Sequence, residues 1–215
     1  ASTRERLRIM AAPAITLHKG DLPADLAFKG SVAIDTETLG LNPLRDRLCL
    51  VQLSGSDGSA HLVQLDPATY DAPRLKALLA DPAVLKIFHF ARFDLAVIQQ
   101  YLGVMVTPVY CTKIVSKLVR TYTDRHGLKD ITAELLGIEL SKQQQSSDWG
   151  QPTLTQQQLA YAASDVLHLH ALKAKLDAML VREGREAFAQ AAFDFLPHRA
   201  RLDLAGYGEQ DIFSH

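Results

Sequence analysis

The sequence predicts an α/β domain built on a mixed sheet of five to six strands that helices flank. Three short apolar segments, at residues 31–35, 48–53 and 60–65, are joined by short turns, as in an antiparallel meander. From residue 73 onward, helical and strand-like segments alternate instead, which is typical of β-α units. A length of 215 residues, 47% of them hydrophobic, is enough for one large domain or two small ones with a substantial core.

The strands are predicted from short apolar runs that turn-forming residues bound. We expect a short edge strand at residues 15–19, and a connecting segment at 20–30 that leads into the first central strand. A loop at residues 38–46 and a turn at 54–58 separate the three strands of the meander. Two later strands are expected at 84–88 and within 104–110.

The helices are predicted from apolar residues at helical spacing together with signals at the helix ends. Pro73 suits the first position of one helix, and Gly103 suits the end of a helix over residues 91–102. Thr155 and Gln158 form a capping-box pattern that opens one long helix ending near residue 181. The other helices are expected at 111–119, 128–136 and 186–195, the last of them stopped by Pro197.

We expect these elements to form one domain at residues 15–197, between an N-terminal arm (1–14) and a C-terminal tail (198–215). The apolar residues of the tail are expected to pack on the domain or on a neighbouring subunit. The arm lacks the apolar segment of a secretory signal, and no apolar run has the length of a transmembrane helix. Cys49 and Cys111 show no disulfide-framework spacing, which indicates reduced, buried thiols in a cytoplasmic protein.

The net charge is −1, from 23 Lys and Arg residues against 24 Asp and Glu. This balance argues against an extended basic surface for duplex or long single-stranded nucleic acid. Residues 111–130 form the most basic window of the chain and contain Lys113, Lys117, Arg120, Arg125 and Lys129.

Two acids at the end of the first central strand are the leading candidates for chemistry. Asp35 and Glu37 are one residue apart, so a strand places both side chains on the same face of the sheet. Two neighbouring carboxylates repel each other, and their burial is costly without compensation. A divalent cation such as Mg²⁺ or Mn²⁺ is one compensation, and solvation of both acids at a polar turn is the alternative.

Three further residues have polar side chains at positions that are expected to be buried. Asp94 lies in the first turn of the helix at 91–102, close to the end of a strand. It is either a site residue or an acid favourably placed by the helix dipole. Tyr161 and Asp165 are four residues apart and share one face of a late helix. They either belong to a site or form a polar contact within the core.

The ordered set Asp35, Glu37, Asp94, Tyr161 and Asp165 resembles the DEDD exonucleases of the ribonuclease H-like superfamily, in the variety with Tyr in its third motif (DEDDy). Further stretches are similar to the nano-RNase C family, which are ribonuclease D-like enzymes of alphaproteobacteria. These stretches lie at 35–41, 86–95, 120–129, 141–149 and in the tail from Phe195 to Phe213. The resemblance covers roughly residues 15–215. One departure is Phe90, which stands where many relatives have Asn.

The resemblance implies hydrolysis of a terminal phosphodiester from the 3′ end, with 5′-mononucleotides as products. Two divalent metal ions, Mg²⁺ or Mn²⁺, would straddle the scissile phosphate. Asp35 would bridge both ions, Glu37 and Asp165 would complete the ion that holds the attacking water, and Asp94 would hold the second. Tyr161 would orient the nucleophile, since its unperturbed pKa near 10 suits a positioning role better than that of a base.

The resemblance also implies a short RNA substrate, chiefly diribonucleotides such as pGpG, with DNA as a further candidate. Leu41 matches a position where relatives insert an apolar wedge between two bases, although a core leucine in a loop is the alternative. Basic residues of the 111–130 window would cap a 5′ phosphate, or form a solvated helix face. The predicted substrate-binding residues are Thr36, Thr38, Leu41, His89, Lys113, Arg125 and His126.

About fifty residues follow Asp165, too few for the helical RNA-binding domains that follow the nuclease domain in ribonuclease D. The resemblance implies a homo-octameric assembly without a membrane partner. Trp149, the only tryptophan, is expected to line the groove or a subunit contact together with Asp148 and the neighbouring glutamines. Two other functions remain open: a broader exonuclease on longer RNA or DNA, and a non-catalytic nucleic-acid-binding module. The presence of all four acids together with Tyr161 argues against the last.

Overall fold

A single six-stranded sheet runs through the molecule, in the order β1-β4-β3-β2-β5-β6. A computed structural model describes residues 12–215 of the chain. The strands are β1 (Ala14–Lys19), β2 (Ser31–Thr38), β3 (Leu48–Ser54), β4 (Ser59–Gln64), β5 (Leu85–Phe88) and β6 (Val109–Cys111). β2, β3 and β4 form the predicted antiparallel meander, and β1 joins its outer edge parallel to β4. β5 and β6 extend the other edge in parallel, so the predicted mixed sheet is confirmed.

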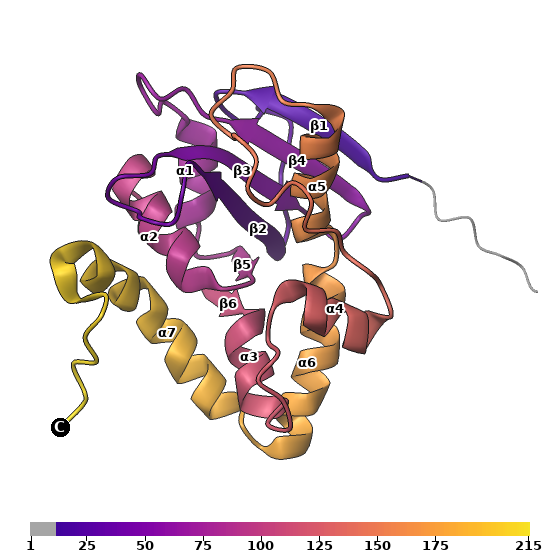
Figure 1. The fold of residues 1–215 in the computed structure, drawn as a ribbon, viewed down its shortest axis with the longest axis vertical. Helices are drawn as coiled ribbons and strands as arrows, with labels where there is room; N and C mark the ends of the chain where they lie inside the picture. The colour runs from indigo at the N-terminus through magenta and orange to yellow at the C-terminus, as the bar shows by residue number, and fades with distance from the viewer. Residues whose placement is uncertain (1–11) are drawn as a thin grey trace, which may run out of the picture.

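Helices cover the sheet, as Figure 1 shows with α5 in front of β3 and β4. They are α1 (Pro73–Ala80), α2 (Ala91–Leu102), α3 (Thr112–Val119), α4 (Leu128–Leu136), α5 (Gln156–Leu167), α6 (Leu169–Glu183) and α7 (Glu186–Leu202), followed by a π-helical turn, η1 (Asp203–Tyr207). Alternate residues of β3 serve two apolar layers, since Leu50 packs with Ala162 of α5 and Val51 belongs to the main core with α1 and α2. The two faces of the central strands are therefore both covered, which leaves the strand ends as the place for a cleft.

The long helix predicted from residue 155 to 181 is in fact two helices. Its start is confirmed, because Thr155 and Gln158 form the reciprocal capping box. At His168, however, φ is −109° and ψ is −1°, and the chain turns between α5 and α6. Ala162 of α5 packs in the layer over β3, whereas Val166 of α5 and Leu172 of α6 both pack in the main core. Tertiary packing thus overrides the continuous helical pattern at the break.

Pro197 does not stop the last helix, contrary to the prediction. α7 continues through Pro197 to Leu202, and Pro197 itself is buried. An interior proline costs a helix roughly 3 kcal/mol. Burial of Phe193, Leu196 and Ala200 on the same helix offsets that cost.

Within the region predicted as a tail, Asp203 is paired with Arg92 of α2 and Leu204 contacts the main core, whereas Ile212 and Phe213 are exposed. The predicted domain bounds stay a prediction. Most of the predicted N-terminal arm lies outside the described residues. Cys49 and Cys111 are buried free thiols, as predicted. Within residues 12–215, no helix combines the length and apolar character that crossing a membrane requires.

Candidate active site

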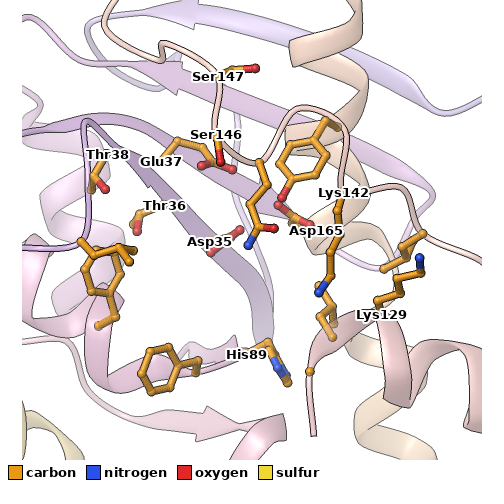
Figure 2. A pocket seen from close by; sticks show the side chains of 18 of the residues that line it. Asp35, Thr36, Glu37, Thr38, His89, Lys129, Lys142, Ser146, Ser147 and Asp165 are labelled. Atoms are coloured by element: carbon orange, nitrogen blue, oxygen red, sulfur yellow. The ribbon is translucent and has the colours of Figure 1, made fainter. Parts of the chain in front are cut away.

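A cleft of about 630 Å³ opens where β2 ends, and three of the four predicted acids, Asp35, Glu37 and Asp165, line it. β2 contributes Asp35 and Glu37 from alternate positions on one face, and α5 contributes Asp165 (Figure 2). One carboxylate oxygen from each of these three residues lies within 4.8 Å of those of the other two. Acids that are 128 residues apart in the chain, at positions 37 and 165, thus share one site.

Asp94 lies beside this cluster of three acids, in the first turn of α2, and only 3% of its surface is exposed. The register of β2 with β5 pairs Ala33 with Ile87, which brings the start of α2 to the level of Asp35. Asp94 accepts a hydrogen bond from the Thr36 hydroxyl, and burial, followed by the charge of the nearby Asp35, raises the pKa of Asp94 well above its ordinary value. The structure therefore brings all four predicted acids together.

Burial and mutual repulsion perturb the acids of this site. Desolvation raises the pKa of Asp35 from 3.8 to about 6. Desolvation, followed by the charges of the neighbouring acids, raises the pKa values of Glu37 and Asp165 well above their ordinary values. Clustered, partly buried carboxylate oxygens of this kind suit a hard divalent cation, which would hold the acids in their charged form.

Gln52 is a site residue that the sequence reasoning missed. It lies on β3 directly opposite Asp35, and its amide nitrogen donates to Glu37 (3.2 Å) and toward Asp35 (3.5 Å). One signal was available in the sequence. Gln52 is the polar residue within an otherwise apolar strand core, Leu48 to Leu53, and such a residue needs a partner.

Tyr161 lines the cleft one helical turn before Asp165. Desolvation, followed by the charge of Asp165, raises the pKa of its hydroxyl, so the phenol stays protonated. Trp149 packs beside it, with ring centroids 6.0 Å apart, and is almost fully buried. Trp149 is not among the residues that line the cleft, so the prediction that it lines the groove is wrong, and a subunit contact stays a prediction.

Five of the seven predicted substrate-binding residues line the cleft, namely Thr36, Thr38, Leu41, His89 and Lys113. Leu41 is 87% exposed, so the alternative of a core leucine is wrong. The pairing of β2 with β3 shifts register between Glu37 and Thr38, and the loop that follows carries Leu41 to the rim. His89 is held by Thr112 (Nδ1 to Oγ1, 2.9 Å), and burial lowers its pKa to about 3, which makes it a neutral side chain.

Arg125 and His126 lie in the loop between α3 and α4 and are not among the residues that line the cleft. Arg125 pairs with Asp130 at 3.1 Å, and the His126 Nδ1 lies 2.8 Å from the Ser116 hydroxyl oxygen. Their role in substrate binding stays a prediction.

The segment between α4 and α5 supplies further cleft residues. Gln145 is one of the glutamines that were predicted to line the groove, whereas Lys142, Ser146 and Ser147 were not selected from the sequence. Figure 2 shows Lys142, Ser146 and Ser147 around the acids, together with Lys129 of α4. Because this segment forms no regular element, no periodic pattern marks it. Phe90, the departure from the family pattern, also lines the cleft, with the Lys113 ammonium 4.4 Å from its ring centre.

Comparisons with known proteins agree with this geometry. A model of the 3′-5′ exonuclease family matches residues 20–181. Ribonuclease D of Gluconacetobacter diazotrophicus is 38% identical over 154 residues, which cover 72% of this chain and 39% of that protein. This chain thus spans about two fifths of the length of the curated ribonuclease D relatives that it matches first.

Two solved structures from Brucella melitensis cover nearly the whole chain. NrnC bound to pGG is 57% identical with a TM-score of 0.91, over 94% of this chain and 99% of that one. NrnC with bound Mg²⁺ is 56% identical with a TM-score of 0.90, over the same shares. The resemblance to nano-RNase C and to ribonuclease D is confirmed. The chain therefore belongs to the 3′-5′ exonuclease family and has its DnaQ-like, ribonuclease H-like fold.

Proposed function

We propose that this chain is a 3′-5′ exoribonuclease that hydrolyses short oligoribonucleotides, chiefly diribonucleotides such as pGpG, to 5′-mononucleotides. The observation that carries the proposal is the convergence of Asp35, Glu37 and Asp165, with Asp94 beside them, at one end of an open cleft. The 57% identity to NrnC bound to pGG supports a dinucleotide-sized substrate. The net charge of −1 is also in keeping with a short substrate.

The donor set fits divalent metal ions, because it consists of carboxylate oxygens that are costly to bury together without a cation. Asp35, Glu37 and Asp165 would hold one ion, and Asp94 would help Asp35 to hold a second. When bound, such ions supply an activated water and stabilise the leaving 3′ oxygen. Mg²⁺ is the first candidate since the related NrnC binds it, and Mn²⁺ is the second.

The remaining cleft residues would bind and orient the substrate. The protonated Tyr161 hydroxyl would donate to the attacking water or to the phosphate, which positions the nucleophile. Exposed Leu41 would stack against the bases at the rim without regard to their identity. Lys113 and Lys142, which line the same cleft, would attract the phosphate groups.

A broader exonuclease acting on longer RNA or DNA is the second candidate, and the identity to ribonuclease D favours it. The third candidate, a non-catalytic binding module, needs no cluster of desolvated acids, so the geometry weighs against it. Homo-octamer formation in the cytoplasm stays a prediction. Light scattering of the purified chain tests the assembly, and a monomer in solution would contradict it.

Product mapping on 5′-phosphorylated RNAs of two to seven nucleotides, in Mg²⁺ or Mn²⁺, tests the function. We expect mononucleotide release with a clear preference for the dinucleotide, and no release in EDTA. Equal rates on the dinucleotide and the seven-mer would select the broader exonuclease. The matched control is Asp35→Asn, which keeps the side-chain shape but removes the charge, and which we expect to be inactive.

A further inference from the structure

We propose that Gln52 is a positioning residue that sets Asp35 and Glu37 in place before a divalent ion binds. The inference rests on the proposed function, because it concerns how the same acids receive a metal.

Backbone pairing brings Gln52 to the acids. In the antiparallel pair of β2 and β3, Gln52 lies directly opposite Asp35, and directly opposite residues project from the same face. Glu37 projects from that face too, two residues further along β2. The amide nitrogen of Gln52 has two hydrogens, and it lies 3.2 Å from Glu37 Oε1 and 3.5 Å from Asp35 Oδ2. One amide group thus contacts both the Asp35 and the Glu37 carboxylates.

The burial of Gln52 points to a role beyond packing. Its side chain is fully buried, and its amide oxygen has no hydrogen-bond partner among the described residues. A buried acceptor without a partner costs free energy, which an apolar side chain of the same size would avoid. All its neighbours from Leu48 to Leu53 on β3 are apolar. Stability alone would favour an apolar residue at this position. We therefore infer that a glutamine is present because its amide N–H groups donate to the acids.

A neutral donor is suited to this position for electrostatic reasons. A lysine or arginine here would neutralise the carboxylates and compete with a cation for them. The glutamine amide orients the two carboxylates and leaves their charge available. Groups that orient metal ligands in this way typically change metal affinity or activity by about 10–100-fold when they are removed.

The test measures Mg²⁺ binding to the full chain by calorimetry, after EDTA treatment, for the wild type and for Gln52→Met. Methionine keeps the length of the side chain and removes both hydrogens. We expect Mg²⁺ affinity to fall by about tenfold or more. The Mg²⁺ concentration that gives half-maximal hydrolysis should rise by the same factor, with the rate at saturating Mg²⁺ less affected.

The matched control is Ser54→Ala. Ser54 is a buried polar residue two positions along the same strand, but its hydroxyl donates to the Ser59 carbonyl (2.7 Å) and not to the acids. We expect this variant to bind Mg²⁺ as the wild type does. A Gln52→Leu variant provides a second test, because leucine also removes both hydrogens and is compact and apolar. It should bind Mg²⁺ more weakly than the wild type.

Wild-type Mg²⁺ affinity in Gln52→Met would overturn the inference, and so would wild-type affinity in Gln52→Leu if the methionine variant does not fold. An equal loss of affinity in Ser54→Ala would show a general effect of the strand and would also overturn it. A wild-type chain that neither binds Mg²⁺ nor hydrolyses RNA would instead contradict the proposed function. The two failures are therefore distinguishable.

Discussion

The four clustered acids should destabilise the folded chain when no metal is present, and Asp35 gives the effect a magnitude. Burial raises the pKa of Asp35 from 3.8 to about 6, a change of roughly 2 units. Each unit corresponds to about 1.36 kcal/mol, so an ionised Asp35 costs the folded state about 3 kcal/mol. Asp35→Asn removes the charge and keeps the shape. In EDTA at pH 7 it should raise the free energy of unfolding by up to about 3 kcal/mol.

The direction of the pH dependence follows from the raised pKa. Between about pH 4 and 6 the folded chain holds a proton on Asp35 that the unfolded chain has released, so raising the pH favours unfolding. The stabilisation is complete below about pH 4 and is lost by about pH 7. For a chain of this size, 3 kcal/mol corresponds to about 6–12 °C in the unfolding temperature. The gap between Asp35→Asn and the wild type should therefore narrow from about 3 kcal/mol at pH 7 to about 1 kcal/mol at pH 4.5.

Urea unfolding in EDTA, followed by circular dichroism at pH 4.5 and 7, measures both effects. The control is Asp57→Asn. Asp57 is an exposed acid whose pKa is lowered by hydrogen bonds from Ser59, so its replacement should not stabilise the chain. Added Mg²⁺ should stabilise the wild type and leave Asp35→Asn nearly unchanged. If Asp35→Asn were less stable than the wild type in EDTA at pH 7, the argument from desolvation and repulsion would be wrong.

Three other predictions concern single side chains. Leu41→Ala should raise KM for a dinucleotide several-fold. Because Leu41 is exposed, the free energy of unfolding in urea should change by less than about 0.5 kcal/mol. An unchanged KM would contradict the proposal that Leu41 stacks against the bases. Tyr161→Phe should lower kcat by about tenfold or more with Mg²⁺ affinity retained, and a normal kcat would show that the hydroxyl is dispensable. Arg92→Ala should lower the free energy of unfolding by about 1–2 kcal/mol, since it breaks the bidentate pair with Asp203 (both contacts 2.7 Å) that ties α2 to the tail. The control is Arg45→Ala, which breaks the exposed ion pair with Asp46 and should cost less stability. Equal losses of unfolding free energy in the two variants would contradict this prediction.

The acids could be predicted from the sequence because periodicity alone relates them. Asp35 and Glu37 share a face in any strand, and Tyr161 and Asp165 share a face in any helix. These relations hold even though the helix that carries Tyr161 ends at Leu167 instead of residue 181. The order of the motifs along the chain then identified the family.

Other features depend on tertiary contacts that no local pattern contains. The break at His168 lies within a continuous apolar pattern, and residues on both sides of it pack in the main core, so periodicity does not mark it. Lys142 and Ser146 reach the cleft from an irregular segment, where neither a strand nor a helix period applies. Exposed Leu41 and buried Trp149 were each left with two interpretations, because residue type does not decide exposure in a loop.

Gln52 shows why a site residue can be missed in the sequence although its chemistry matters. Its polarity within an apolar strand was visible, but its meaning depends on the pairing of β3 with β2, which places it opposite Asp35. The same pairing explains why the site is costly without metal, since β3 and α5 shield the acids from water on the sides where they do not face the cleft. The shielding that raises the pKa of Asp35 also strengthens its attraction for a cation, because charges interact more strongly in a low dielectric. Removal of the charge at position 35 and removal of the donor at position 52 should therefore both weaken Mg²⁺ binding. Only the first should stabilise the metal-free chain at pH 7.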